Sequence, residues 1–454
     1  MYPAEQQGEV QNFRLLLAHP WSRRILVPNQ ALPRLTRIAI PKWTRTAHYL
    51  TKMLQQQWGS NFVVIDFIDN DQAVAPVVVV EVRSQEWDFY SAGFLSIEEA
   101  ALHHDLTSAE QMTINKIIAG DTNGRGPFSR IGWVDDAQCW IRQSLGQPQL
   151  SFSNNIHQLN AGGSFSLARF TSDSGTAYWL KAVRHPNTHE LEVTRTLARL
   201  YPEFLPPLIA ARTDWNAWVT EEVGQPLETN FGPSELERSV RCLADLQIAT
   251  TAHLDTLLQA GCFDLRTDAL GHHLCSLSKY LANAMDRQTS TKAPPMSPDS
   301  LSALTVLLDR ALAKLDALLI PDALIHNDLN SGNILIESSR AVFIDWSEAC
   351  IGNPFLTFQN LLAYASESED ISGSCSEITQ VYAERWSSIL PRYQIDLAII
   401  LSRPLAVAAY LIGRDPSFNA PFRHLEHVQS YARSLARTMD RFTKSPEFLE
   451  ALCN

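Results

Sequence analysis

The sequence lacks paired cysteine motifs and an excess of positive charge. Its seven cysteines are scattered along the chain, and none stands in a CxxC pair. We therefore expect reduced thiols, as in a cytoplasmic protein, and no disulfide framework. Lysine and arginine together number 37, against 49 aspartates and glutamates, which gives a net charge of −12. This acidic balance argues against a broad surface for nucleic acid or for anionic membranes.

Long uninterrupted apolar runs are also missing. The first residues show no basic segment leading into an apolar stretch, so we expect no signal peptide. The most apolar late segment, residues 397–412, is interrupted by Arg403 and Pro404 and is predicted to fall short of a membrane span. The chain has no GxSxG motif, which leaves a serine hydrolase without a visible nucleophile. We predict a soluble cytoplasmic protein.

The composition is that of a folded chain with more than one domain. Hydrophobic residues make up 45% and charged residues 19% of the 454 residues, too many residues for one ordinary core. Two stretches rich in Gly, Pro, Ser, Thr or Gln are typical of connectors. We interpret residues 145–151 as a domain boundary and residues 287–300 as a loop between helices.

The predicted N-terminal domain, residues 1–146, mixes strands with helices. Short β-branched runs such as NFVVIDFI favour strands, and residues 43–58 favour a helix with Pro41 near its first turn and Gly59 after its end. This order is similar to that of Nudix hydrolases, but the helix lacks the glutamates that hold their Mg²⁺. The acidic string of residues 65–71 is interpreted as a strand end with an Asx turn. We assign this domain no chemistry; one hypothesis is that it covers a cleft and helps to select substrate.

After residue 151 the pattern changes. Strands and Gly-containing turns lead to a strand that is predicted to end in Lys181, and a helix is predicted over residues 188–200. From Ser234 onward the chain is predominantly helical, apart from one segment. That segment reads NDLNSGNILIESSRAVFIDW and ends at Trp346.

Two short apolar runs in this segment flank a Ser-Ser turn and predict a hairpin. The hairpin would bring Asp345, at the end of its second strand, back beside Asn333, which precedes the first strand. Asp328 lies in the loop just before. Three oxygen-bearing side chains are thus expected at one end of the hairpin.

Such a set suits phosphoryl transfer. Asn333 and Asp345 offer hard oxygen ligands for Mg²⁺ shared with substrate phosphates. Asp328 is placed to accept a proton from an attacking hydroxyl. The alternative is a polar loop that merely caps a hairpin, but the joint spacing of these residues with His326 favours the functional interpretation.

The sequence resembles the aminoglycoside phosphotransferase and choline kinase family of small-molecule kinases. Their HxDxxxxN loop is matched by HNDLNSGN from His326, and their apolar strand ending in IDF or IDW is matched by FIDW. Asn327 replaces the Gly common in the aminoglycoside branch, although choline kinases also carry HND. The resemblance implies an α+β, bilobal protein-kinase-like fold, with a β-rich lobe at residues 151–226 and a helical lobe at residues 227–450, preceded by the separate N-terminal domain.

The resemblance also implies roles for residues. Asp328 would be the catalytic base, Asn333 and Asp345 would hold Mg²⁺, and Lys181 would reach the phosphates of ATP. A glutamate on the following helix should pair with the lysine. The face of Glu190 continues through apolar residues, whereas Glu192 lies on a charged face, so we predict Glu190.

Two backbone segments are implied in nucleotide binding as well. The turn with Gly162, Gly163 and Ser164 would present amides to the phosphates. The backbone of Glu221 and Glu222 would meet the adenine edge, with both side chains solvated. A Gly-Gly pair between strands is, by itself, equally typical of a simple hairpin.

The predicted function is therefore an ATP- and Mg²⁺-dependent phosphotransferase acting on a hydroxyl of a small molecule, such as an amino sugar or amino alcohol. Its expected partners are a nucleotide and that substrate, with neither nucleic acid nor membrane. Glu348 with Asp264 or Asp268 would form an acidic wall for a cationic substrate, or these are ordinary surface carboxylates. Trp346 and Phe355 are interpreted as core residues. The alternative function is a catalytically silent nucleotide-binding scaffold or regulatory protein.

Overall fold

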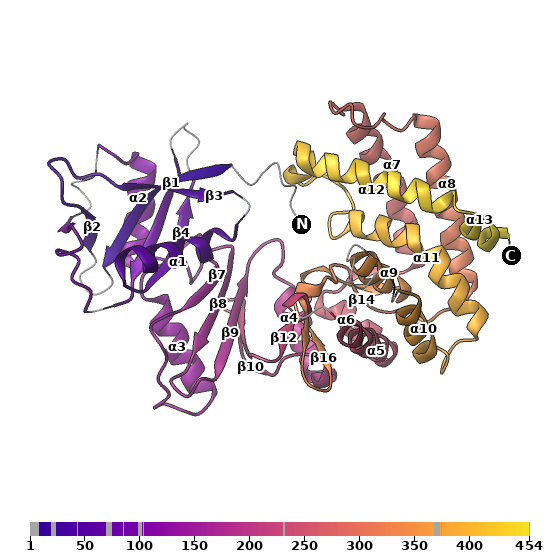
Figure 1. Cartoon of the computed structure of the whole chain (residues 1–454), viewed down its shortest axis with the longest axis horizontal. Coiled ribbons are helices and arrows are strands. Elements are labelled where there is room, and N and C mark those ends of the chain that lie inside the picture. Colours follow the sequence, from indigo (N-terminus) through magenta and orange to yellow (C-terminus); the bar gives the residue numbers. More distant parts are fainter. Residues whose placement is uncertain are drawn as a thin grey trace. The chain divides into compact units, whose positions relative to one another are not determined.

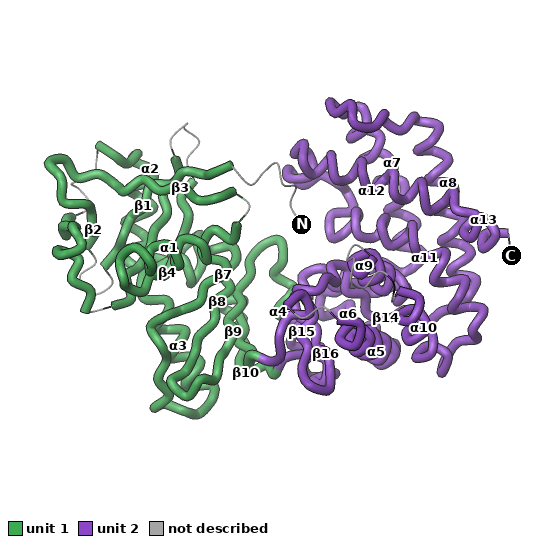
Figure 2. Tube along the Cα trace, in the orientation of Figure 1, with its two compact units in different colours: residues 1–191, 207–222 green, residues 192–206, 223–454 purple. Residues whose placement is uncertain are grey.

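The computed structural model describes residues 9–19, 24–42, 44–69, 75–84, 86–98, 102, 104–229, 232–366, 373 and 375–453. The chain divides into two compact units, which Figure 2 shows in two colours. The first unit comprises residues 1–191 and 207–222, and the second comprises residues 192–206 and 223–454.

The first unit opens with a six-stranded sheet of order β4-β5-β1-β2-β6, in which β3 also pairs with β1. Strand β1 runs parallel to β5, and the other pairs are antiparallel. The strands are β1 (Val10–His19), β2 (Arg24–Pro28), β3 (Thr36–Pro41), β4 (Phe62–Ile68), β5 (Val77–Val82) and β6 (Phe94–Ile97). The helices of this part are α1 (Thr46–Trp58), α2 (Ser108–Ala119) and α3 (Trp133–Ser144).

Alternating residues of β1 feed two cores on opposite faces of this sheet, as the two-residue period of a strand requires. Leu17 packs with Leu50 of α1 on one face. Leu16 belongs to the other core, with Ile114 of α2 and Ile141 of α3. The sheet is therefore covered by helices on both sides (Figure 1).

Local signals for the helix ends are partly confirmed. Helix α1 ends at Gly59, which has a φ of +64° that glycine adopts at low cost. Thr107 and Glu110 form a capping box at the start of α2. The prediction for Pro41 is wrong, because this residue ends β3 and α1 begins only at Thr46.

The second sheet of the first unit is antiparallel, with order β10-β11-β9-β8-β7. Its strands are β7 (His157–Asn160), β8 (Phe165–Thr171), β9 (Ala177–Val183), β10 (Leu208–Arg212) and β11 (Ala217–Glu221). One face, with Phe170 and Leu180, joins the core that also holds Leu16 and α3. The other face places Val183 and Trp218 against Leu191 of α4 (Glu190–Leu200).

The predicted boundary at residues 145–151 joins α3 to the second sheet. Residues on both sides of this connector contribute to one core, so the N-terminal α+β segment and the β-rich lobe form a single compact unit. The domain limits 1–146, 151–226 and 227–450 therefore stay a prediction. The α+β class is confirmed: a β-rich part and then a helical part follow an N-terminal segment with its own sheet.

Helices dominate the second unit. They are α5 (Pro233–Thr250), α6 (Leu254–Ala260), α7 (Thr267–Asp286), α8 (Pro298–Ala317), α9 (Phe355–Ser366), α10 (Cys375–Trp386), α11 (Arg392–Ile412), α12 (Glu426–Thr443) and α13 (Pro446–Cys453). The predicted loop between helices separates α7 from α8, and its last residues, from Pro298, begin α8. Trp346 and Phe355 are both buried in the core of this unit, as predicted.

Two three-stranded sheets complete the second unit, with orders β12-β15-β16 and β13-β17-β14. Their strands are β12 (Gln225–Pro226), β13 (Phe263–Leu265), β14 (Ala323–His326), β15 (Ile334–Ile336), β16 (Ala341–Phe343) and β17 (Ala349–Gly352). Short 3₁₀ helices connect the elements of this unit: η3 (Pro202–Phe204), η4 (Leu227–Thr229), η5 (Ser331–Asn333), η6 (Trp346–Glu348) and η8 (Pro421–His424).

Helix α11 contains the apolar segment that was expected to fall short of a membrane span. By length and composition it is long and apolar enough to cross a membrane, with a mean hydropathy of 1.8 over its best window, so that expectation is wrong. However, 67% of this window is buried within the protein. Its apolar residues, among them Leu401, Leu405 and Ile412, pack in the core of the second unit.

Candidate active site

The hairpin predicted around Asn333 and Asp345 is present in the second unit. Strands β15 and β16 pair antiparallel, with Ile334 opposite Phe343. The amide of Ile344 donates to the carbonyl of Asn333 over 3.0 Å, which extends the pairing to the residue before Asp345. Asp345 itself leaves the strand with a φ of +65°, a left-handed conformation that turns the chain into η6.

Asp328 lies in the loop between β14 and this hairpin, and two asparagines hold the loop in shape. The side-chain amide of Asn333 donates to the carbonyl of Asp328 over 2.9 Å. Asn330 accepts from the amide of Gly332 over 2.9 Å and donates to the Asp328 carboxylate over 3.4 Å. The loop therefore places Asp328 and Asn333 together, as the spacing predicts.

The charge state of Asp328 is set by several neighbours. Burial is the largest influence and raises the pKa of its carboxyl. The nearby Asp345 also raises this pKa, whereas His326 and the hydrogen bond from Asn330 lower it. A carboxyl with a raised pKa is a stronger proton acceptor, which suits a general base.

His326 has a structural part in this loop. Its backbone amide donates to the Thr357 hydroxyl over 3.0 Å, and its Nε2 lies 2.8 Å from the carbonyl oxygen of Ile344. Its ring lies 4.7 Å from that of Trp346, between centroids. His326 thus ties the loop of Asp328 to the strand that leads to Asp345.

The donor set at Asn333 and Asp345 fits a hard cation. The Asn333 amide nitrogen is bound to the Asp328 carbonyl, which leaves the amide oxygen as the ligand of this side chain. Asp345 adds a carboxylate and accepts from the Ser347 hydroxyl over 2.9 Å. Groups of three or more His, Cys, Asp or Glu suited to a metal do not occur among the described residues. Two protein ligands are in keeping with Mg²⁺, which retains waters and binds substrate phosphates.

A third carboxylate, Glu348, lies in the same region. Its pKa is raised to about 7, chiefly by burial; Asp328 and Asp345 contribute to this rise, while Arg414 opposes it. The other proposed members of an acidic wall do not join it. Asp264 is bound to Arg266 over 2.7 Å, and Asp268 is exposed in the first turn of α7. Of the three, Glu348 alone has a described interaction with Asp328 and Asp345.

In the first unit, the predicted lysine and glutamate are paired. Lys181, on β9, contacts Glu190 at the start of α4, with 2.6 Å between Nζ and Oε1. Glu190 is 1% and Lys181 12% exposed, so this pair is shielded from water and its geometry is fixed. Glu192, by contrast, forms an exposed ion pair with Arg195, as its charged face predicts. The choice of Glu190 is correct as a matter of geometry.

The glycine turn joins β7 to β8, and two hydrogen bonds close it. Gly162 has a φ of +117°, which only glycine adopts without strain. Its carbonyl accepts from the Ser166 hydroxyl over 2.8 Å, and the Ser164 carbonyl accepts from the Arg184 amide over 2.9 Å. The carboxylate of Asp66 lies beside this turn, with its Oδ1 3.2 Å from the position of a Cβ on Gly162, a contact that sequence analysis missed. The phosphate-binding role of this turn stays a prediction.

The backbone amides of Glu221 and Glu222, which are expected to meet the adenine edge, donate hydrogen bonds to other backbone carbonyls of the protein. Glu221 donates to the Pro207 carbonyl over 3.0 Å, and Glu222 donates to the Ala177 carbonyl over 2.9 Å. The prediction that both side chains are solvated is wrong for Glu222. Its carboxylate accepts two hydrogen bonds of 2.6 Å from Arg169 and one of 2.9 Å from Trp179. An adenine contact by this backbone stays a prediction.

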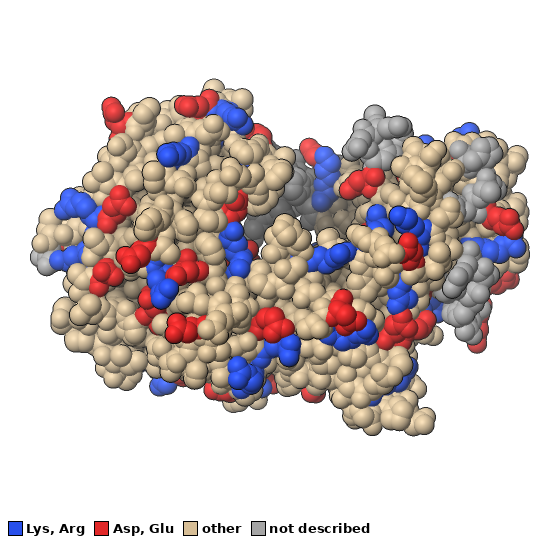
Figure 3. Space-filling model, turned by 180° about the vertical axis from the view of Figure 1, so that it is seen from behind, with Lys and Arg blue, Asp and Glu red and all other residues tan. Residues whose placement is uncertain are grey.

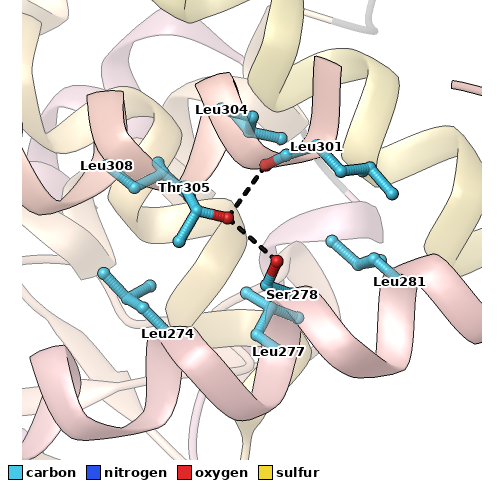
Figure 4. Close-up of a pocket in the computed structure, with 8 residues that line it drawn as sticks. All are labelled: Leu274, Leu277, Ser278, Leu281, Leu301, Leu304, Thr305 and Leu308. Carbon is cyan, nitrogen blue, oxygen red and sulfur yellow. Dashed lines mark hydrogen bonds between the residues drawn. The ribbon is translucent and has the colours of Figure 1, made fainter. Parts of the chain in front are cut away.

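Two further surfaces bear on ligand binding. A small hollow between α7 and α8 is lined by leucines, with the Thr305 hydroxyl bound to Ser278 over 3.0 Å (Figure 4). None of the predicted site residues lines this hollow, which lies at the packing interface of the two helices. On the face shown in Figure 3, acidic and basic residues are interspersed. Among the described residues of that face, Lys and Arg form no continuous patch.

A loop and hairpin with such carboxylates and a buried Lys-Glu pair are features that phosphoryl-transfer enzymes use. Residues 155–373 match the model of the Phosphotransferase enzyme family. This match confirms the resemblance and the expectation of a small-molecule kinase. The match contains Lys181, Asp328 and Asp345. A comparison with curated proteins gives no match.

Solved structures similar to this chain are small-molecule kinases by their titles. A choline/ethanolamine kinase family protein from Mesorhizobium loti is 14% identical, with a TM-score of 0.46 over 70% of this chain and 98% of that one. Macrolide 2'-phosphotransferase from Brachybacterium faecium is 17% identical, with a TM-score of 0.45 over 66% and 98%. Plasmodium vivax ethanolamine kinase is 12% identical, with a TM-score of 0.45 over 78% and 95%. At these values the likenesses do not decide the substrate.

Proposed function

We propose that this protein uses ATP and Mg²⁺ to phosphorylate a hydroxyl of a small molecule, such as an amino sugar or amino alcohol. The observation that carries the proposal is the loop in which Asn333 binds the backbone of Asp328 while Asp345 lies close enough to raise the pKa of the Asp328 carboxyl. In this proposal, the base Asp328 works beside two oxygen ligands, Asn333 and Asp345. Phosphoryl transfer to an alcohol needs this combination.

Each residue has a separate task in this proposal. Asp328 accepts the hydroxyl proton and orients the oxygen for attack. Asn333 and Asp345 would hold Mg²⁺, which when bound neutralises charge on the phosphate oxygens. Lys181, fixed by Glu190, binds phosphate oxygens of the nucleotide.

The preference for an amine-bearing acceptor rests on Glu348. Its carboxylate is partly buried beside Asp328 and Asp345, and an uncompensated group of buried carboxylates is unfavourable. An ammonium group of the acceptor would offset this charge. Arg414 does so only in part, since it also donates to the carbonyls of Ala349 and Gly261.

The direct test is incubation of the protein with Mg-ATP and panels of amino sugars, amino alcohols and neutral sugars. Phosphate gain is read by mass spectrometry, and a cell extract provides candidates outside the panels. We expect one phosphate on a hydroxyl and a preference for cationic acceptors. A preference for neutral sugars would contradict the assignment of Glu348, and the absence of any phosphorylated product would argue against the proposed reaction.

The alternative is a catalytically silent scaffold that binds nucleotide. One observation favours it: the turn of Gly162 and Gly163, expected to face phosphate, lies against the carboxylate of Asp66. Titration calorimetry with Mg-ATP separates the two functions when it is combined with the acceptor panel. Nucleotide binding without turnover on any hydroxylated compound would support the scaffold.

A further inference from the structure

The turn of Gly162 and Gly163 is covered by backbone of the N-terminal segment. A Cβ added to Gly163 would lie 1.7 Å from the carbonyl oxygen of Arg125, a distance that no side chain tolerates. A Cβ on Gly126 would in turn lie 3.1 Å from the Gly163 carbonyl oxygen. The two chain segments therefore pack backbone against backbone. Gly163 is needed for this close approach, whatever the turn binds.

A buried carboxylate holds the same turn from the side. Asp66 lies in β4 and is 6% exposed. The backbone of Gly163 lowers the pKa of this carboxyl, and a Cβ on Gly162 would lie 3.2 Å from its Oδ1. The carboxylate therefore lies directly against the turn.

The charge of Asp66 is compensated locally. Arg125 donates to it through Nη2 over 2.5 Å and Nε over 2.9 Å, and Ser129 donates its hydroxyl to the same oxygen. Burial raises the pKa of Asp66 and Arg125 lowers it. Because the carboxylate is paired with a guanidinium, it adds no net negative charge beside a turn that is expected to bind phosphate.

The strand that enters the turn is fixed to the same part of the chain. The Gln158 side chain of β7 accepts from the Val64 amide over 2.9 Å and donates to the Val64 carbonyl over 2.8 Å. His157 lies 3.0 Å from His48 of α1, between ring nitrogens. The N-terminal segment thus supports both β7 and the turn that follows it.

We propose that Asp66 and Arg125 are positioning residues that hold the turn of residues 162–164 in the conformation that binds nucleotide phosphate. The inference rests on the proposed function, because it presumes a nucleotide. A turn with two adjacent glycines has high conformational freedom, and fixing it before binding lowers the entropic cost of binding. Because Asp66 lies beside Gly163, we assign the phosphate-binding amides to Gly162 and Ser164. The N-terminal segment would thus assist nucleotide binding by positioning the turn, without contributing a catalytic residue.

The test measures nucleotide binding and turn mobility in the full-length protein. Asp66→Asn and Arg125→Ala should raise the Kd for Mg-ATP about tenfold, the effect of losing a hydrogen bond to a charged group. The KM for the acceptor should not change. Asp173→Asn, an exposed carboxylate in the β8–β9 turn of the same unit, is the matched control and should bind as the parent protein does. Ser129→Ala removes a single hydrogen bond to Asp66 and provides a milder variant if the others do not fold.

Hydrogen exchange of residues 160–166, measured without nucleotide, supplies a second readout. Exchange there should be faster in Asp66→Asn than in the parent protein, with residues 177–183 of β9 unchanged. Exchange and a Kd equal to those of the parent protein would overturn the inference. Tighter nucleotide binding by Asp66→Asn would also overturn it, because the contact of Asp66 with the turn would then oppose binding. If the parent protein binds no Mg-ATP, the proposed function fails, whereas the exchange comparison still tests whether Asp66 restrains the turn.

Discussion

The side-chain amide of Asn333 donates a hydrogen bond to the main-chain carbonyl of Asp328, with 2.9 Å between nitrogen and oxygen. This bond joins the third and the last residue of the HNDLNSGN loop. One residue thus shapes the loop of the proposed base and is also the proposed oxygen ligand. The same residue also begins the hairpin that returns the chain to Asp345.

Removal of the Asp345 carboxylate should weaken the response to Mg²⁺. In Asp345→Asn we expect the Mg²⁺ concentration for half-maximal activity to rise about tenfold or more, in line with effects on metal affinity at such sites. Activity measured over a Mg²⁺ titration at saturating nucleotide checks this. Asp396→Asn, an exposed residue of α11, is the control. An unchanged Mg²⁺ dependence would remove Asp345 from the metal site.

The Lys181-Glu190 pair predicts a contrast between two glutamates of one helix. Lys181→Ala and Glu190→Gln should each raise the KM for ATP, by about tenfold for the lysine, because a charged contact to phosphate is lost or misplaced. Glu192→Gln, whose carboxylate is 49% exposed, should leave the KM unchanged. Steady-state kinetics with nucleotide varied provide the measurement. Similar effects at Glu190 and Glu192 would contradict a specific pairing.

Glu348 predicts a pH dependence of stability. Its pKa is raised from 4.5 to about 7 in the folded protein, chiefly by burial. Between these pH values the folded state binds more protons at this carboxyl than the unfolded state, so the free energy of unfolding falls as the pH rises. The parent protein should lose more stability between pH 5 and pH 8 than Glu348→Gln.

Urea unfolding at the two pH values measures this difference. Glu377→Gln, an exposed glutamate in the first turn of α10, controls for a general change in charge and should follow the parent protein. If Glu348→Gln shows the same pH dependence as the parent protein, Glu348 is not the buried, proton-binding group described above.

The sequence predicted the parts of the site that depend on local order. The hairpin, the loop of Asp328 and the choice of Glu190 follow from spacing and helical periodicity, which act over a few residues. Contacts between distant segments were not predictable in this way. The bond between Asp66 and Arg125 spans 59 positions and that between Arg169 and Glu222 spans 53, and no local pattern marks either partner.

The dependence on local patterns also explains why residues 145–151 are interpreted as a domain boundary. A stretch rich in Gly, Pro and Gln separates α3 from β7 and is typical of a linker between domains. Yet Trp133 and Ile141 before it share a core with Phe170 and Leu180 after it. The composition of a segment indicates where the chain turns. Whether the residues on its two sides are buried in one core depends on packing, which a single sequence does not show.

The central claim is that Asp328 is the base of a phosphoryl transfer. It is tested most directly by Asp328→Asn, which keeps the size of the side chain and removes its basicity, with Asp316→Asn on the exposed side of α8 as the control. Phosphate transfer to the acceptor identified by mass spectrometry is measured beside the Kd for Mg-ATP. We predict that transfer by Asp328→Asn falls at least about a hundredfold while Mg-ATP still binds. Transfer at the parent rate by Asp328→Asn would contradict the account.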